Sequence, residues 1–226
     1  MIFYPSKEKI YRILQNQLSS FWEGLYDWAF IEKAAEVAFE RVNENLQQSN
    51  IGRFKGEKGC IFSVYDTTIW GIFLYCLANT LGDMKRLDEA NVIYYLNKVM
   101  HSVDWFYEIE LPVHFMTEHP LGSVLGRAGY GDYLMVYQGV TVGGNRKEEK
   151  IVYPKLGNNI VLYANSTVLG DTIIGNNVIV SAGTMLMNEV IPDNCIVFGR
   201  TPNITIKERN RTDIKQRTSH LWKWRE

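Results

Sequence analysis

A six-residue spacing of buried-type side chains governs the second half of this 226-residue chain. A period of six matches neither the 3.6-residue α-helix nor an alternating strand that ends in a hairpin turn. It is typical of a solenoid, in which each hexapeptide forms one short strand and one corner. Leu134 and Val140 show the same step upstream of the main run. The two sets of positions are Leu156, Leu162, Val168, Ile174, Val180 and Leu186, and, four residues after each, Ile160, Ser166, Thr172, Val178, Thr184 and Val190.

In such a solenoid the aliphatic side chains point into a prism-shaped core, and neighbouring coils must stack because one coil cannot bury its own faces. Gly157-Asn158-Asn159 and Gly175-Asn176-Asn177 are suited to the corners, since Gly and Asn tolerate a positive φ. The eleven residues NRKEEKIVYPK between Gly144 and Leu156 break the period. We expect them to form an extruded, charged loop, the kind of segment that often carries specificity.

The first half has helical spacing instead, from Lys7 to about Met100. Its most apolar segment, Thr67–Leu81, is predicted to be a buried helix with Asp66 as N-cap and Gly82 as C-cap. A second helix is predicted over roughly Leu87–Met100.

The fold class is therefore α+β. We expect a helical domain over residues 1–105, a β-helix over 106–206 and a basic tail over 207–226. The tail has alternating Trp222 and Trp224 near its end, and we expect it to pack on a neighbouring subunit with its charges in solvent.

Composition narrows the function classes. With 46% hydrophobic and 22% charged residues the chain can bury a core, and a net charge of -1 provides no basic surface for nucleic acid. Cys60, Cys76 and Cys195 lack metal-ligand spacing, which indicates reduced thiols in the cytoplasm. The first residues lack a secretory apolar stretch, and Thr67–Leu81 is too short to cross a bilayer, so no membrane span is expected.

Four short motifs follow one another in the second half, between about Asp104 and Pro202. They are Glu118-His119-Pro120-Leu121-Gly122-Ser123-Val124, Gln138-Gly139-Val140-Thr141-Val142-Gly143-Gly144, Tyr153-Pro154-Lys155-Leu156 and Gly199-Arg200-Thr201-Pro202. In order and spacing they resemble motifs of the hexapeptide-repeat acyltransferases, most closely the serine O-acetyltransferases.

This resemblance implies a left-handed parallel β-helix, although connections between parallel strands are normally right-handed. It also implies a homotrimer or a dimer of trimers, with acetyl-CoA as co-substrate in grooves between subunits, a small-molecule or saccharide hydroxyl as acceptor, and no metal.

The catalytic base implied by the resemblance is His119, since a neutral imidazole can take the proton of an attacking hydroxyl. A carboxylate normally orients such a base. Asp104 lies fifteen residues upstream, at the family's spacing, whereas Glu108 stands in a segment similar to the family's Asp-Ile-His-Pro. Both acids remain candidates.

The donor side of the site is implied by small residues. Gly143 and Gly144 let the backbone approach the thioester, and a main-chain N–H there is the expected oxyanion donor. Ala164 and Ala182 match positions where the family places small corner residues beside the pantetheine arm.

The acceptor side departs from the family. Glu118 stands where the family has Asp, and Tyr153 where it has a second His. A phenol cannot bring a positive charge to a carboxylate, so two acceptors remain open: L-serine and a sugar hydroxyl of a surface polysaccharide. A pocket lined by Tyr130, Tyr133, Tyr137 and Tyr153 would suit a pyranose ring.

Two other classes remain as rivals. Some hexapeptide solenoids bind zinc through three histidines, but of the four histidines His101, His114, His119 and His220 only two lie near the repeats. The second rival is a scaffold that keeps the solenoid for assembly and performs no chemistry.

Overall fold

The computed structural model describes residues 1–223, and its first half contains four α-helices that follow the apolar periodicity of the sequence. Helices α1 (Lys7–Trp22) and α2 (Trp28–Gln48) each bury one apolar stripe. Helix α3 (Thr67–Asp83) is buried around almost its whole circumference, and α4 (Leu87–His101) packs against it. The two predicted helices are thus confirmed.

The predicted N-cap of α3 is present, but the predicted C-cap is wrong. The Oδ1 atom of Asp66 accepts hydrogen bonds from the N–H groups of Thr68 (3.0 Å) and Ile69 (3.2 Å). Gly82 lies inside the helix, where a Cβ atom would stand 2.8 Å from a ring carbon of Tyr107. Close packing therefore explains this glycine, and the chain reverses at Lys85, whose φ is 61°.

A small sheet that the sequence analysis did not predict completes the helical domain. Strand β1 (Ile2–Tyr4) pairs in parallel with β3 (Gly59–Ser63), which forms an antiparallel pair with β2 (Lys55–Gly56). The 3-10 helix η1 (Gly52–Phe54) precedes β2 and carries Arg53.

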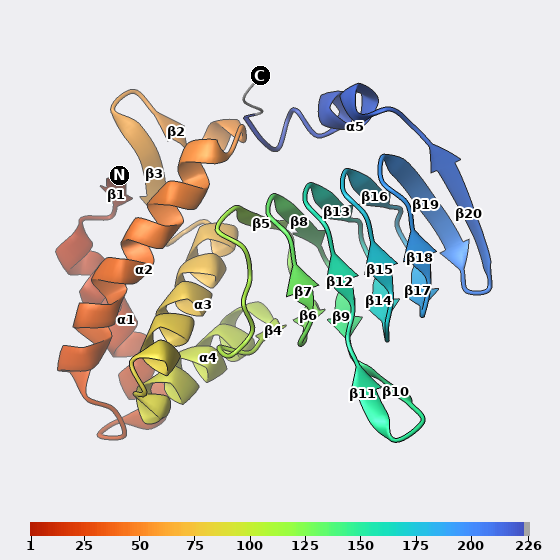
Figure 1. The fold of residues 1–226 in the computed structure, drawn as a ribbon. Helices are drawn as coiled ribbons and strands as arrows, with labels where there is room; N and C mark the ends of the chain where they lie inside the picture. Colours follow the sequence, from red (N-terminus) through yellow and green to blue (C-terminus); the bar gives the residue numbers. More distant parts are fainter. Residues whose placement is uncertain (224–226) are drawn as a thin grey trace.

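The second half is a left-handed parallel β-helix with three faces, as predicted (Figure 1). Strands of successive coils pair in parallel on each face. The first face consists of β5 (Phe115–Glu118), β8 (Leu134–Tyr137), β13 (Ile160–Leu162), β16 (Val178–Val180) and β19 (Cys195–Arg200). The second consists of β4 (Asp104–Trp105), β6 (Val124–Leu125), β9 (Thr141–Gly143), β14 (Thr167–Leu169) and β17 (Met185–Met187), and the third of β7 (Gly129–Tyr130), β12 (Lys155–Leu156), β15 (Ile173–Ile174) and β18 (Val190–Ile191).

The six-residue column forms the core of this solenoid. All six aliphatic positions from Leu156 to Leu186 are buried, and so is the second set except Val190, which is 71% exposed. The reason is a change of register. Lys155 pairs with Ile173, eighteen residues on, but Ile173 pairs with Val190, only seventeen residues on. Ile191 therefore takes the inward position.

The interruption of the period is an extruded hairpin, as expected, but it is shorter than the eleven residues that the sequence suggested. Leu134 pairs with Ile160, twenty-six residues on and thus eight more than the eighteen of a regular coil. The excess forms β10 (Asn145–Lys147) and β11 (Lys150–Val152), which project from the coils in Figure 1. Tyr153 to Lys155 return to the coil.

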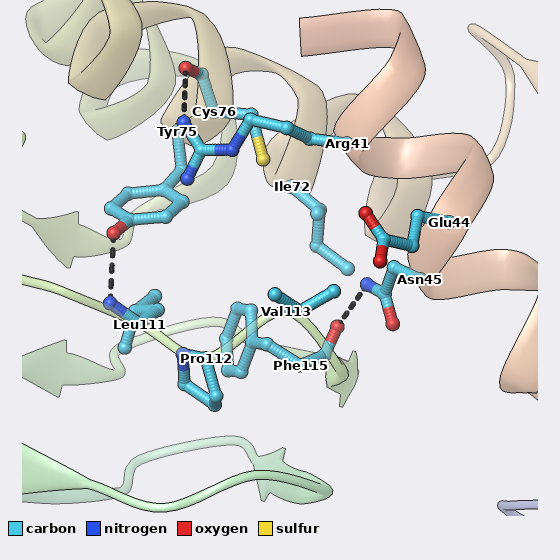
Figure 2. Close-up of a pocket in the computed structure, with 10 residues that line it drawn as sticks. All are labelled: Arg41, Glu44, Asn45, Ile72, Tyr75, Cys76, Leu111, Pro112, Val113 and Phe115. Atoms are coloured by element: carbon cyan, nitrogen blue, oxygen red, sulfur yellow. Dashed lines mark hydrogen bonds between the residues drawn. The ribbon is translucent and has the colours of Figure 1, made fainter.

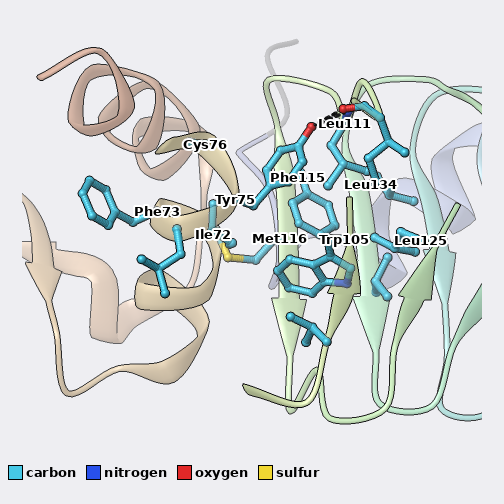
Figure 3. Packing of buried hydrophobic residues seen from close by; sticks show 14 of the residues in the cluster. Ile72, Phe73, Tyr75, Cys76, Trp105, Leu111, Phe115, Met116, Leu125 and Leu134 are labelled. Atoms are coloured by element: carbon cyan, nitrogen blue, oxygen red, sulfur yellow. Dashed lines mark hydrogen bonds between the residues drawn. The ribbon is translucent and has the colours of Figure 1, made fainter. Parts of the chain in front are cut away.

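The helical domain covers the open end of the first coil. Trp105 and Phe115 fill that coil, and Met116 lies against Ile72 of α3 (Figure 3). The hydroxyl of Tyr75 donates to the carbonyl of Ile109 (2.6 Å). Figure 2 shows the same hydroxyl accepting the N–H of Leu111, and the Asn45 amide donating to the carbonyl of Phe115. A solenoid needs such a cap because its terminal coil would otherwise expose its core.

The C-terminal segment returns along the coils to the helical domain of the same chain (Figure 1). Strand β20 (Asn203–Glu208) pairs with β19, and α5 (Arg211–Arg217) follows. The buried Trp222 bridges to Ser49, and the N–H of Asn50 donates to the carbonyl of Leu221 (2.8 Å).

The described part of the tail thus packs on the helical domain of its own chain, and its packing on a neighbouring subunit stays a prediction; Trp224 lies outside the described residues. Within residues 1–223 no helix has the length and apolarity needed to cross a membrane.

The stacking of coils predicts a large cost for a core truncation. Leu162 is fully buried, so Leu162→Ala is expected to lower the free energy of unfolding by about 2–5 kcal/mol through lost burial and a residual cavity. Urea denaturation measures this change. Val37→Ala on the exposed side of α2 is the control, and equal losses for the two variants would contradict the core assignment.

Candidate active site

His119 lies on a two-residue bulge at a corner of the β-helix. Glu118 pairs with Tyr137, nineteen residues on. The carbonyl of Leu121 accepts the N–H of Gly139 (2.9 Å). In a parallel pair this bond sets Leu121 opposite Gln138, which is seventeen residues further on. His119 and Pro120 therefore have no counterpart in the next coil. His119 has a φ of 49° and an exposed side chain, so the imidazole is at the surface of the corner instead of in the prism.

The two predicted pantetheine-side alanines lie on the same corner as His119. The N–H of Asn165, which follows Ala164, donates to the carbonyl of Gln138 (2.8 Å). The N–H of Gly183, which follows Ala182, donates to the carbonyl of Ala164 (2.9 Å). Ala164 and Ala182 are thus two and three coils from His119. Since neighbouring strands are about 4.8 Å apart, they lie roughly 10 and 14 Å along the solenoid axis. The corner offers a straight path for an elongated ligand.

The predicted oxyanion glycines lie on a different corner. Strand β9 runs from the corner of His119 to Gly143, so the width of one face, on the order of 10 Å for three residues, separates the two sites within one chain. Tyr153 is on the second corner, with its ring close to Gly144. One chain therefore carries two separate groups of predicted residues.

The two glycines differ in what surrounds them. A Cβ atom on Gly144 would lie 2.7 Å from both the Tyr153 ring and the Ile151 side chain at the base of the hairpin. At Gly143 the nearest atom to such a Cβ would be 3.9 Å away, on Leu169. Packing explains Gly144, whereas among residues 1–223 no neighbouring atom requires a glycine at position 143.

Asp104 lies on the face that starts at the corner of His119, since β4 pairs with β6. Each of its oxygens accepts one hydrogen bond from a side chain: Oδ1 from the Tyr94 hydroxyl (2.6 Å) and Oδ2 from the Lys98 ammonium (2.7 Å). Burial raises the pKa of Asp104, but these two hydrogen bonds outweigh it and leave the pKa below its ordinary value. The carboxylate is thus held in its ionised form.

Glu108 forms an exposed ion pair with Arg127 (3.3 Å). Arg127 follows Gly126, whose N–H donates to Val142 at the end of the second face, so Glu108 belongs to the next corner. Within residues 1–223 the His119 ring has no hydrogen-bond partner, and neither acid contacts it.

Glu118 is held by a residue from the helical domain that the sequence analysis missed. Its Oε1 atom accepts from Nη1 of Arg53 (3.1 Å), and Nε of Arg53 donates to Oδ2 of Asp66 (2.9 Å). These residues line a hollow at the start of α3 that also includes His119 and Tyr65. No local pattern could have indicated the contact, because Arg53 precedes Glu118 by 65 residues and belongs to another domain.

The expected pocket of four tyrosines is wrong for a single chain, because their rings are spread over three places. Tyr130 and Tyr153 line a shallow hollow on the third face, Tyr133 stacks on His114 (ring centroids 4.6 Å apart), and Tyr137 stacks on Tyr163 (4.9 Å).

The histidines are also dispersed. His101 is buried, where its ring hydrogen-bonds Asn97 (2.7 Å) and burial lowers its pKa to about 4, and His114 pairs with Asp132 (2.6 Å). In the described part of the chain no three His, Cys, Asp or Glu side chains are grouped to hold a metal ion.

Residues 153–188 match the family model for the bacterial transferase hexapeptide (six repeats). The chain is similar to the serine acetyltransferase of Synechococcus elongatus, with 32% identity over 53% of this chain and 49% of that protein. It is also similar to that of Staphylococcus epidermidis, with 28% identity over 44% and 47%. The chain thus spans about half the length of these relatives.

Solved structures of serine acetyltransferases share the fold. The enzyme from Vibrio cholerae superposes with a TM-score of 0.67 at 21% identity, covering 83% of this chain and 73% of that one. The Neisseria gonorrhoeae enzyme in complex with serine gives 0.64 at 20% identity, covering 84% and 80%. A serine acetyltransferase complex with CoA gives 0.64 at 19% identity, covering 80% and 75%. The resemblance to hexapeptide-repeat acyltransferases of the serine O-acetyltransferase type is thereby confirmed.

The different surroundings of the two glycines yield a matched pair of variants. Gly144→Ala is expected to lower the free energy of unfolding by about 1–3 kcal/mol, because the added methyl group overlaps Tyr153 and Ile151. Gly143→Ala has room for its methyl group, so its effect is expected to stay within about 0.5 kcal/mol. Chemical denaturation of both variants checks this, and a larger loss for Gly143→Ala would refute the packing assigned to this corner.

Proposed function

We propose that this protein is an acetyl-CoA-dependent O-acetyltransferase whose acceptor is the hydroxyl of L-serine. The observation that carries the proposal is the bulge that exposes His119 on the corner shared with Ala164 and Ala182. The relatives and the solved structures of the same fold are serine acetyltransferases, which favours serine over a sugar hydroxyl.

In the proposed reaction the neutral imidazole of His119 takes the proton of the serine hydroxyl while the oxygen attacks the thioester carbonyl. The tetrahedral intermediate then collapses as its C–S bond breaks, and the proton passes from the imidazolium to the departing thiolate of CoA. A positioned base of this kind contributes on the order of 10²–10⁴-fold to the rate.

Asp104 is the better candidate for orienting His119, because its face begins at the corner of His119 whereas Glu108 belongs to the next corner. An ionised carboxylate that accepts an N–H from the imidazole would set its tautomer and stabilise its protonated form. Tyr94 and Lys98 each use one acceptor site on Asp104, and a carboxylate oxygen can accept a second hydrogen bond, so the imidazole would bind beside them.

The separation of the two corners indicates a site shared between copies of the chain. One acetyl group can contact both His119 and the backbone at Gly143 only if these come from different subunits. The second and third faces expose apolar side chains that suit such packing, including Val124 and Val190. We therefore place acetyl-CoA in the groove between two copies of a trimer, where the N–H groups at Gly143 and Gly144 would stabilise the oxyanion.

The corner of His119 suits the co-substrate. Small side chains at Ala164 and Ala182 leave the backbone of successive coils accessible, as an extended pantetheine arm requires. We place the reaction in the cytoplasm, since Cys60, Cys76 and Cys195 are free thiols.

The base assignment predicts that His119→Ala lowers turnover with acetyl-CoA and L-serine by about 10²–10⁴-fold. Release of CoA thiol measures the rate. Because the side chain is exposed, stability is expected to change little.

His220→Ala, at another exposed histidine, is the matched control and should keep full activity. Undiminished turnover of His119→Ala would refute the mechanism. A wild-type protein that binds no CoA in calorimetry would instead favour the non-catalytic scaffold.

A further inference from the structure

Arg53 is held in one orientation beside the candidate active site. Its guanidinium lies over the ring of the buried Phe54, 4.5 Å from the ring centre, and its Nε donates to Asp66 (2.9 Å). Asp66 is itself fixed, because its other oxygen caps α3. The cation is therefore preorganised by the helical domain before any ligand arrives.

The same guanidinium still has donors to offer. An arginine carries five N–H groups. In the described part of the chain only Nε and Nη1 of Arg53 donate to side-chain oxygens, and the side chain is 41% exposed. A carboxylate could therefore bind in the two-pronged geometry that guanidinium groups favour.

The charges of the hollow select a zwitterion over a simple anion. One guanidinium faces the two carboxylates of Asp66 and Glu118, which makes the cluster negative and repels a lone anion. An amino acid can instead insert between Arg53 and Glu118, with its carboxylate on the guanidinium and its ammonium on the glutamate. This exchanges one exposed ion pair, which contributes little, for two new ones.

Binding of an amino acid between Arg53 and Glu118 also explains the two acceptor-side positions at which this sequence differs from the family, Tyr153 and Glu118. Tyr153 cannot supply a cation, and within one chain it lies on a different corner from His119. Glu118, one methylene longer than aspartate, contacts the guanidinium across the domain boundary. On the basis of the proposed acetyl transfer to serine, we propose that Arg53 binds the acceptor carboxylate and thereby selects amino acids as acceptors.

The test pairs a variant with a change in the substrate. Wild-type protein should acetylate L-serine with a KM roughly 10- to 100-fold below that for L-serinamide, in which a neutral amide replaces the carboxylate. Arg53→Met should raise the KM for L-serine by about that factor, leave the KM for acetyl-CoA unchanged and abolish the preference over L-serinamide. Arg53→Lys, which keeps the charge, should retain part of the preference.

Arg217→Met removes another exposed, ion-paired guanidinium, on α5, and should change neither KM. Serine turnover by the wild type with an unchanged preference in Arg53→Met would overturn the role of Arg53 alone. A wild type that does not acetylate serine would overturn the proposed function together with this inference. If Arg53→Met does not fold, Arg53→Gln with the same two substrates decides between these outcomes.

Discussion

Each coil of the β-helix can bury its aliphatic side chains only against the coils on either side of it, and this stacking determines where every other residue can be. Side chains such as Leu162 and Val180 are fully buried because their positions repeat at eighteen-residue intervals. A coil of different length must extrude the excess or shift its register. The bulge at His119, the hairpin that follows Gly144 and the exposure of Val190 all result from this constraint.

The stacking of coils also places the predicted catalytic residues on different corners of the β-helix. Backbone hydrogen bonds between coils align His119 with Ala164 and Ala182, and they hold Gly143 one face away. A rigid face cannot bend to bring these groups together, because its strands are fixed on both sides. The proposed reaction between a base on one corner and main-chain donors on another is therefore a property of an assembly and not of one chain.

The helical domain contributes more than a cover for the first coil. The start of α3 depends on Asp66, which caps the helix and also orients Arg53 toward Glu118. A single carboxylate thus links the stability of a buried helix to the charge balance beside His119. Under the proposed role of Arg53, this arrangement would give the domain, whose packing on the β-helix is mainly apolar, a direct part in acceptor recognition.

The sequence by itself determined the β-helix, the main helices and the position of the hairpin, because the spacing of buried side chains is set by residues that are close together in the chain. It also singled out His119 and the small residues of the two corners through short motifs. Only the tertiary structure decided that Gly82 and Gly144 serve packing, that the C-terminal segment returns to its own helical domain, and that Arg53 meets Glu118. These outcomes depend on contacts between segments far apart in the chain, and such contacts leave no local period or motif from which to predict them.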